Sequence, residues 1–189
     1  MRIVVSDAGP LIHLAQIGQL QLLKNLFRCV SVTAKVKNET VDEGINHGFV
    51  DAQIIGEAIQ DGWITIEDIF EHQSKLVEQL VIGENISHAD AETLLLAKNK
   101  DAELLVDDRV VADLAKMYGI KIWNTWTILL ESLSEGLIEI QDIYSAIEEL
   151  GKKRHKLSQK QAEEILKAAN TTVAHKKNHS ITQTKTNKP

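Results

Sequence analysis

The sequence predicts an α/β protein of three layers, in which helices cover both faces of a central, mainly parallel sheet and further helices follow at the C-terminal end. Two observations lead to this prediction. Short apolar, β-branched runs alternate with segments of helical periodicity, and parallel strands joined by helices need this alternation. Acidic residues also recur directly after several of the apolar runs, where open α/β sheets place their chemistry.

The expected strands and helices follow one another in regular order. Strands are expected at RIVVS (2–6), CVSV (29–32), WITI (63–66), ELLV (103–106) and IKIW (120–123), because these runs are short and rich in β-branched or aromatic residues. Helices are expected over 10–27 with a break at Gly18, and over 33–45, 48–60, 68–81, 87–98, 109–118, 125–134, 141–150 and 158–169. A helix therefore follows every strand, as right-handed crossovers require.

The charges of the chain divide it into an acidic body and a basic end. Residues 1–150 hold 11 Lys/Arg against 25 Asp/Glu, whereas residues 151–189 hold 10 against 2. We expect an α/β domain over 1–150, a basic segment with a C-terminal helix over 151–170, and a disordered basic tail over 171–189. The acidic body argues against strong nonspecific duplex binding, because neutralising phosphates needs Lys and Arg. The basic end either supplies that charge, starting with KKRHK (152–156), or is solvated surface.

The sequence gives no sign of a membrane or an oxidising compartment. No apolar run approaches the roughly 18 residues of a membrane span, and the first residues, MRIVVSD, are expected to form a strand. The single cysteine, Cys29, has no partner for a disulfide and is expected as a small core residue. We therefore expect a cytoplasmic protein.

Four acidic residues occupy positions where such a sheet gathers its chemistry. Asp7 follows the first strand, Glu39 follows the second, Asp90 lies in the first turn of a helix, and Asp108 follows the run LLV. Carboxylates gathered in one crevice repel one another unless a hard divalent cation such as Mg²⁺ or Mn²⁺ shares them. The pattern indicates a metal-dependent nuclease. Structural alternatives remain open, because Asp7 can cap a helix, Asp90 can form a capping box with Ser87, and Glu39 can be solvated.

Two further acids are candidates for the same site. Asp107 stands beside Asp108, and adjacent acids at the end of a buried strand need compensation, either from Arg109 or from a cation. Glu92 follows Asp90 by two residues, which places the two side chains about 200° apart on a regular helix. Only one of that pair can therefore face a metal.

Residues with hydroxyl or imidazole groups are expected mainly in structural roles. His13 lies among apolar residues of the first helix and is expected as a partly buried helix residue. Thr125 follows Asn124 after the last strand and is expected as part of a helix cap, with hydrogen bonding around the site as the alternative. His88 is either a surface residue at a helix start or a contact to phosphate.

The order of these motifs resembles that of a known family. VVSDAGPLIHLA, VTAKVKNE, SHADAETLLLA and LLVDDRVVADLAKMYGIKIWNTWTILL together resemble PIN-domain proteins, notably VapC-like ribonucleases of prokaryotic toxin–antitoxin pairs and a less characterised PIN-like branch. The resemblance covers roughly residues 1–150 and depends on order and spacing rather than on any single motif. It implies a PIN-like α/β/α fold that acts as an Mg²⁺- or Mn²⁺-dependent endoribonuclease.

The resemblance also implies roles and partners. Asp7, Glu39, Asp90 and Asp108 match the family's catalytic acids. Asp7, Asp90 and Asp108 would be metal ligands with Asp107 as a further one, and Glu39 would position or deprotonate the attacking water. RNA is the implied substrate, a cognate antitoxin protein the implied partner, and a homodimer the implied assembly.

The chain departs from the family pattern in three places. Thr33 stands where a proline is frequent, Ala89 and Asp90 replace Gly and Glu, and Val106 stands where many relatives have a threonine or serine. The last change removes a possible hydrogen bond to a metal ligand. It favours a second hypothesis, a PIN-like module that binds nucleic acid or protein without cutting. A receiver-like phosphorylation switch is disfavoured, because Lys121 stands at the beginning of its strand.

Overall fold

The chain forms two compact units, Met1–Thr125 and Trp126–Pro189. In this computed structural model, the described residues are 2–27, 29–153 and 157–186. The division comes after residue 125, whereas the sequence predicts a domain of 1–150. The reason is that the last strand ends at Trp123, after which the chain is helical with short connections.

The first unit is built on a parallel sheet of five strands. The strands are β1 (Val4–Ser6), β2 (Val30–Val32), β3 (Ile64–Ile66), β4 (Glu103–Leu105) and β5 (Ile122–Trp123). Their order is β3-β2-β1-β4-β5, with every neighbouring pair parallel. In the central strand, Val4 is aligned with Val30 on one side and with Glu103 on the other. The parallel sheet expected from the sequence is confirmed, and all strands end at one edge.

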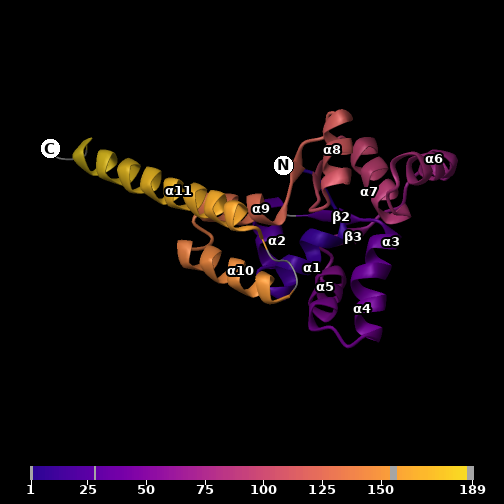
Figure 1. Ribbon diagram of the computed structural model, residues 1–189, viewed down its shortest axis with the longest axis horizontal. Coiled ribbons are helices and arrows are strands. Elements are labelled where there is room, and N and C mark those ends of the chain that lie inside the picture. Colours follow the sequence, from indigo (N-terminus) through magenta and orange to yellow (C-terminus); the bar gives the residue numbers. More distant parts are fainter. Residues whose placement is uncertain (1, 28, 154–156, 187–189) are drawn as a thin grey trace. The chain divides into compact units, whose positions relative to one another are not determined.

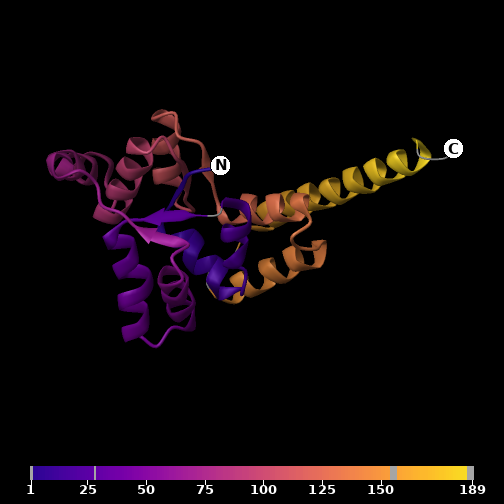
Figure 2. The ribbon, with the colours of Figure 1, turned by 180° about the vertical axis from the view of Figure 1, so that it is seen from behind.

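Helices cover both faces of this sheet. They are α1 (Ala8–Gln16), α2 (Gln21–Phe27), α3 (Ala34–Lys37), η1 (Asn38–Asp42), α4 (Glu43–Asn46), α5 (Val50–Gln60), η2 (Glu71–Gln73), α6 (Ser74–Glu84), α7 (His88–Asn99) and α8 (Arg109–Met117). Figures 1 and 2 show α7 and α8 on one side of the strands and α1, α4 and α5 on the other. The three-layer α/β/α fold is therefore confirmed.

The sheet separates two apolar layers. Val4 and Val5 are both fully buried, as expected for a central strand that is covered on both faces. Leu94 of α7 and Val111 of α8 pack in the cluster that contains Val5. On the other side, α1 packs against α5. Cys29 is only partly buried, with its sulfur 3.9 Å from the Thr65 hydroxyl.

A π-helical turn interrupts the helix expected over 33–45. The segment consists of α3, the π-helix η1 and α4 in direct succession. Thr33 caps its start by accepting a hydrogen bond from the Val36 amide at 3.2 Å. Within it, the Thr40 hydroxyl donates to the Val36 carbonyl at 2.8 Å. Wide turns of this kind occur mostly as single insertions at functional sites, and this one contains Glu39.

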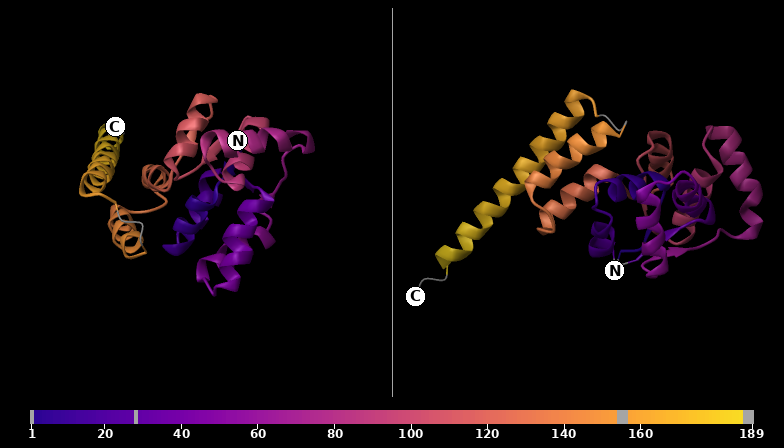
Figure 3. Two further views of the ribbon diagram at one scale, coloured as in Figure 1. Left: turned by 45° about the vertical axis from the view of Figure 1, so that its right-hand side comes forward. Right: turned by 90° about the horizontal axis from the view of Figure 1, so that it is seen from below.

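The second unit is helical. Its elements are α9 (Thr125–Glu135, whose first residue belongs to the first unit), α10 (Ile140–Lys152) and α11 (Gln159–Thr186). Figure 3 shows α10 beside the first part of α11, and Ile143, Leu150 and Ala169 are fully buried. None of the helices in the described ranges is long and apolar enough to cross a membrane.

Helix α11 is longer than the sequence predicts. A helix is expected over 158–169 and a disordered tail over 171–189, yet residues 159–186 are one helix. The hydroxyls of Thr171 and Thr172 donate to carbonyls four residues earlier, and the Lys176 ammonium donates to the Leu133 carbonyl at 2.7 Å. These bonds hold the helix past residue 170. Residues 154–156 of the KKRHK segment and residues 187–189 of the expected tail lie outside the described residues.

Candidate active site

Asp7 lies at the carboxyl end of the central strand. Its amide donates to the Leu105 carbonyl at 2.9 Å, so its backbone continues the contact between β1 and β4. It is the N-cap residue of α1, but its side chain does not make the usual capping hydrogen bond. The residue is only 8% exposed. Asp7 therefore presents a nearly buried carboxylate at the start of α1.

The charge of Asp7 is disfavoured by its surroundings. Burial, together with the nearby charges of Asp90 and Glu39, raises the pKa of its carboxyl from 3.8 to about 7, against the opposing effect of the Ala8 and Gly9 amides. Carboxylates repel strongly only over short distances in a protein. Asp7, Glu39 and Asp90, which belong to three different elements, are therefore near enough for their charges to interact.

Asp90 is fixed in the first turn of α7 by a capping box. Its Oδ2 accepts from the Ser87 amide at 3.0 Å, and the Ser87 hydroxyl accepts from the Asp90 amide at 3.0 Å. The capping box expected from the sequence is confirmed. Asp90 nevertheless raises the pKa of both Asp7 and Glu39, so its charge acts on the site as well. Capping and a place at the site coexist in one residue.

Glu39 meets Asp90 from the π-helical turn. Burial raises the pKa of the Glu39 carboxyl, the charges of Asp90 and Glu43 raise it further, and the Lys35 ammonium lowers it. Lys35 also lies 3.6 Å from Glu92, measured from Nζ to Oε1. Glu92 is thereby paired with α3. The lysine that pairs with Glu92 is thus the one whose charge lowers the pKa of Glu39.

Asp107 is held by a network of donors. Its Oδ2 lies 2.7 Å from Nδ1 of His13 and accepts from the Thr125 hydroxyl at 2.6 Å, while its Oδ1 accepts from the Thr125 amide at 2.8 Å. Burial raises the pKa of the Asp107 carboxyl, but the hydrogen bonds from His13 and Thr125 outweigh burial and hold it below its usual value. A Cβ atom on Gly9 would lie 3.3 Å from Cβ of Asp107. Asp107 is therefore charged and close to the first turn of α1.

Asp108 is fixed at the start of α8 by capping hydrogen bonds. Its Oδ1 accepts from the amides of Val110 and Val111 at 2.8 and 3.0 Å, which makes it the N-cap of α8. The sequence assigns Asp108 to the site and Asp107 as a further ligand, whereas the structure brings Asp107 beside α1. Successive residues of an extended chain point in opposite directions, so only one of the two acids can face that way.

Val106 belongs to the core and not to the site. It is 1% exposed and packs in the apolar cluster with Val5 and Val111. A threonine at this position would place its hydroxyl among apolar side chains, where it needs a partner. The departure from the family pattern at residue 106 is thus accommodated by packing.

His13 is expected as a structural helix residue, and Thr125 mainly as part of a helix cap with a place at the site as the alternative, whereas both contact Asp107. His13 lies four residues after Gly9, so both lie on the same side of α1. Thr125 follows β5, the neighbour of β4, and adjacent parallel strands end at the same edge. The four-residue spacing from Gly9 to His13 and the position of Thr125 after β5 are the sequence signals that place both residues near Asp107.

Two cavities border the carboxylate cluster. One, of about 530 Å³, is lined by Ala34, Lys35, Asn38, Glu39, Glu43, Ser87, His88 and Ala89. The other, of about 300 Å³, is lined by Ile12, Gln16, Glu39, Thr40, Glu43, Gly44, His47, Phe49 and Asp51. Glu39 and Glu43 border both, so the two cavities flank the π-helical turn.

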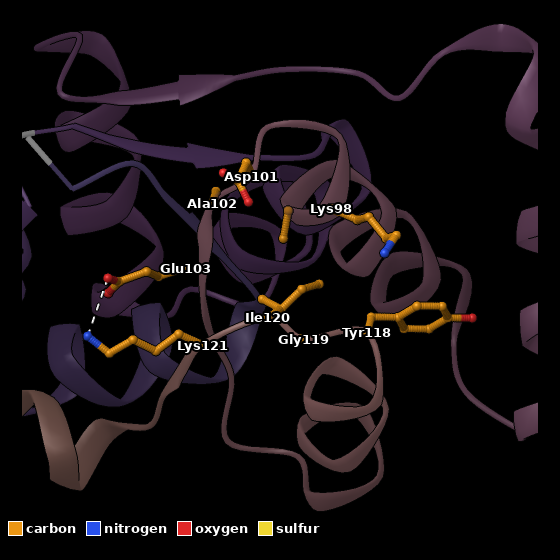
Figure 4. A pocket seen from close by; sticks show the side chains of 9 residues that line it. Lys98, Asp101, Ala102, Glu103, Tyr118, Gly119, Ile120 and Lys121 are labelled. Carbon is orange, nitrogen blue, oxygen red and sulfur yellow. Dashed lines mark hydrogen bonds and ion pairs between the residues drawn. The ribbon is translucent and has the colours of Figure 1, made fainter.

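A third pocket, of about 210 Å³, lies where β4 and β5 begin. Figure 4 shows its lining, with the Lys121 ammonium paired to Glu103 at 3.3 Å. The Lys98 ammonium lies over the Tyr118 ring, 5.1 Å from its centre. Asp7 and Asp107 instead follow the ends of β1 and β4. This pocket is therefore at the opposite edge of the sheet from the candidate site.

The donor set suits a hydrated hard cation. Within the described ranges, no three His, Cys, Asp or Glu side chains are grouped so that they could hold a metal ion by themselves. Mg²⁺ usually keeps several waters and needs only one or two direct carboxylates. Asp7, Glu39 and Asp90 offer oxygen atoms alone, and the pKa of Asp7 is raised first by burial and then by the negative charges of Asp90 and Glu39. A divalent cation would relieve this repulsion directly or through water.

Comparison with known proteins identifies the family. A family model described as a PIN domain matches residues 3–171. A solved structure, that of PAE2754 from Pyrobaculum aerophilum, is similar with a TM-score of 0.50 and 15% identity, over 69% of this chain and 94% of that chain. At this identity the likeness shows the fold alone. The comparison with curated proteins gives no match. The family match, together with the parallel sheet and the acids at its carboxyl edge, shows that this chain belongs to the PIN-domain family, whose fold is of the nuclease type.

Proposed function

We propose that this protein is a divalent-metal-dependent endoribonuclease that hydrolyses phosphodiester bonds in RNA. The observation that carries the proposal is the meeting of Asp7, Glu39 and Asp90 at the carboxyl edge of the sheet, with Asp7 nearly buried. Gathering like charges in a desolvated place costs stability, and such clusters mark functional sites more often than structural ones. The family supports a nuclease as the class of protein.

The role proposed for each residue follows from its burial, its neighbouring charges and its hydrogen bonds. Asp7 and Asp90 supply oxygens for the metal, with Asp107 as the third acid in place of Asp108. A bound Mg²⁺ or Mn²⁺ supplies a Lewis acid that lowers the pKa of water and polarises the phosphate. Burial and like charges make Glu39 a better proton acceptor than a free glutamate, which suits a base that takes a proton from water. His13 and Thr125 fix the orientation of Asp107 through the bonds described above.

Cationic groups beside the cluster suit a polyanionic substrate. Lys35 and His88 stand on the walls of the cavity of about 530 Å³, next to Glu39. The Lys35 side chain is 45% exposed and its 3.6 Å contact to Glu92 is long, so it is available to a phosphate. The basic end of the chain, with 10 Lys/Arg against 2 acids over 151–189, adds sequence-independent attraction.

The biological setting we propose follows the resemblance to VapC-like proteins. It is the toxin of a type II toxin–antitoxin pair in the cytoplasm, neutralised by a cognate antitoxin and assembled as a homodimer. Exposed apolar side chains such as Ile45 and Val50, on the neighbouring helices α4 and α5, support an interaction surface on the first unit. Expression of the protein alone should arrest growth of a prokaryotic host, and the Asp7→Asn variant should not. Growth unaffected by the wild type would count against the toxin role.

One observation favours a second candidate function. The described acids do not form a metal cage by themselves, as expected for a module that binds nucleic acid or protein without cutting it. The deciding experiment measures cleavage of mixed single-stranded RNA by the full chain with Mg²⁺, with Mn²⁺ and with chelator. Asp7→Asn should abolish cleavage, and Asp68→Asn, which changes an exposed acid that lines neither cavity beside Glu39, should not. Wild-type protein that binds this RNA with either metal but leaves it intact is the binding module.

A further inference from the structure

Phe49 is an aromatic residue whose side chain is largely exposed to solvent. It precedes α5 as its N-cap residue and is 55% exposed. Its ring stacks on the His47 ring, with centroids 5.7 Å apart and planes 16° from parallel. Aromatic side chains usually gain stability by burial, and this one is largely unburied. The pair therefore presents a flat π-surface without a packing role that explains it.

Glycines fix this aromatic pair against α4. A Cβ atom on Gly44 would lie 2.5 Å from Cβ of Ala52 and 4.0 Å from the Phe49 ring, so α4 and α5 approach too closely for any other residue. Gly48 turns the chain between them with a φ of +75°. The Phe49 amide then donates to the Gly44 carbonyl at 2.9 Å. The ring is thus held beside the helix that begins with Glu43.

The aromatic pair faces the candidate active site through a shared cavity. Phe49 and His47 line the cavity of about 300 Å³ that Glu39 also borders. Glu39 is close enough to Asp90 for the charge of Asp90 to raise its pKa. A group held between the rings and Glu39 would therefore lie next to the carboxylate cluster. The volume is enough for one planar nucleobase.

We propose that Phe49 and His47 form a stacking platform for an unpaired base of the RNA that passes Glu39. This inference rests on the proposed function and names the substrate class, single-stranded RNA. Stacking on aromatic side chains is how proteins hold bases that are free of a duplex. Gln16 and Asp51 line the same cavity, and in the described part of the chain the structure gives their side chains no hydrogen-bond partner. They are available to the edge of the base.

The charges of the cavity favour a base over a protein partner. Glu39, Glu43 and Asp51 all line it. Closing an apolar protein surface over three carboxylates would desolvate them without compensation. The amino groups of adenine, cytosine and guanine donate hydrogen bonds to carboxylates, so a base can satisfy these groups while its face covers Phe49.

The test measures stacking directly and does not need cleavage. Full-length Asp7→Asn protein is titrated into a short single-stranded RNA that contains 2-aminopurine, whose fluorescence is quenched by stacking. We expect quenching with Phe49 present, about tenfold weaker binding and no quenching after Phe49→Ala, and both restored by Phe49→Trp. A fully paired RNA of the same sequence should show no Phe49-dependent quenching.

Phe70 provides a matched control. It is 59% exposed and its ring stacks on His72 with centroids 5.6 Å apart, but it lines neither cavity beside Glu39. Phe70→Ala should leave RNA affinity and quenching unchanged. The platform is overturned if Phe49→Ala matches its parent, if Phe70→Ala loses as much, or if no RNA binds. Phe49→Ala that alters only sedimentation also overturns it, in favour of a second copy on this face.

The two proposals fail in different ways. Phe49-dependent binding by a protein whose wild-type form never cleaves RNA would leave the platform standing and remove the nuclease. Metal-dependent cleavage with the same KM in wild type and Phe49→Ala would leave the nuclease standing and remove the platform.

Discussion

Thr125 donates two hydrogen bonds to Asp107, one from its hydroxyl at 2.6 Å and one from its amide at 2.8 Å. The two residues follow neighbouring strands, β5 and β4, so the bonds join the ends of these strands at the edge that carries the candidate site. His13 completes the set from α1 at 2.7 Å. The orientation of Asp107 is therefore fixed from two sides, by Thr125 after β5 and by His13 on α1, which follows β1.

Replacing Thr125 by valine should weaken metal binding. The change removes the hydroxyl donor, keeps the amide donor and leaves Asp107 less constrained. Loss of a partner that orients a metal ligand typically costs about 10- to 100-fold in affinity or activity. Titration of Mg²⁺ in the cleavage assay would show it. Thr125→Ser, which keeps the donor, should stay within a few-fold of wild type, and equal loss in both variants would contradict the hydroxyl's role.

The stability of the metal-free protein should fall as pH rises through the titration range of Asp7. Its pKa is 3.8 before folding effects and about 7 in the folded protein, so between these values the folded state holds more protons than the unfolded state. Stability is then lost with rising pH, by on the order of 3 kcal/mol between pH 4 and 8. The pKa of Glu39 is also raised, so its titration adds to the loss of stability with rising pH.

Urea unfolding with chelator at pH 5 and pH 8 measures this effect. Asp7→Asn should flatten the dependence and be more stable than wild type at pH 8. Asp107 acts in the opposite sense, since its lowered pKa gives stability that is lost only at more acidic pH, below this window. A variant Asp7→Asn with the wild-type pH dependence would show that the charge of Asp7 is compensated by other means.

Divalent cations should stabilise the wild type at pH 8 through the same carboxylate. A ligand that binds only the folded state at 100 times its Kd adds about 2.7 kcal/mol. The melting temperature should therefore rise with Mg²⁺ or Mn²⁺ in the wild type and in Asp68→Asn, and much less in Asp7→Asn. An equal rise in all three proteins would place the binding elsewhere.

Gly44→Ala should destabilise the crossing of α4 and α5. The new Cβ would meet Cβ of Ala52 at 2.5 Å, and overpacking of this kind costs about 1–3 kcal/mol. Ala52→Gly removes the opposing atom, so the double variant should recover part of the loss despite the added glycine. Chemical denaturation of the three variants measures this coupling. Additive losses would mean that the two positions do not meet.

Removing residues 177–189 should weaken RNA binding and its salt dependence. The truncation takes away Lys177, Lys185 and Lys188 and keeps Lys176, whose ammonium holds the Leu133 carbonyl. For three phosphate contacts on single-stranded RNA, the slope of log affinity against log salt should fall by about 2. Unchanged affinity and slope would show that this end of the chain is only solvated surface.

The sequence predicts the strands and their parallel arrangement well, for local reasons. Each strand is a short β-branched run, and the parallel arrangement follows from the alternation with helices. Gly18 breaks the first helical segment with a φ of +68°, as its position predicts. Ser87 and Asp90 form the predicted capping box because that motif needs only residues three apart.

The remaining features depend on contacts between distant residues. Asp107 and His13 are 94 positions apart, so the choice of Asp107 over Asp108 appears only when α1 is docked on the sheet. The π-helical turn at Glu39 has no propensity signal that separates it from a regular helix. The length of α11 depends on bonds within the second unit, among them that of Lys176 to the Leu133 carbonyl, which composition alone cannot show.

The capping box of Asp90 gives Ser87 an influence beyond its own position. Ser87 holds the amide and the carboxylate of Asp90 at the start of α7. The charge of the same Asp90 carboxylate raises the pKa of Asp7 and of Glu39. A change at residue 87 would therefore reach the site through a helix start.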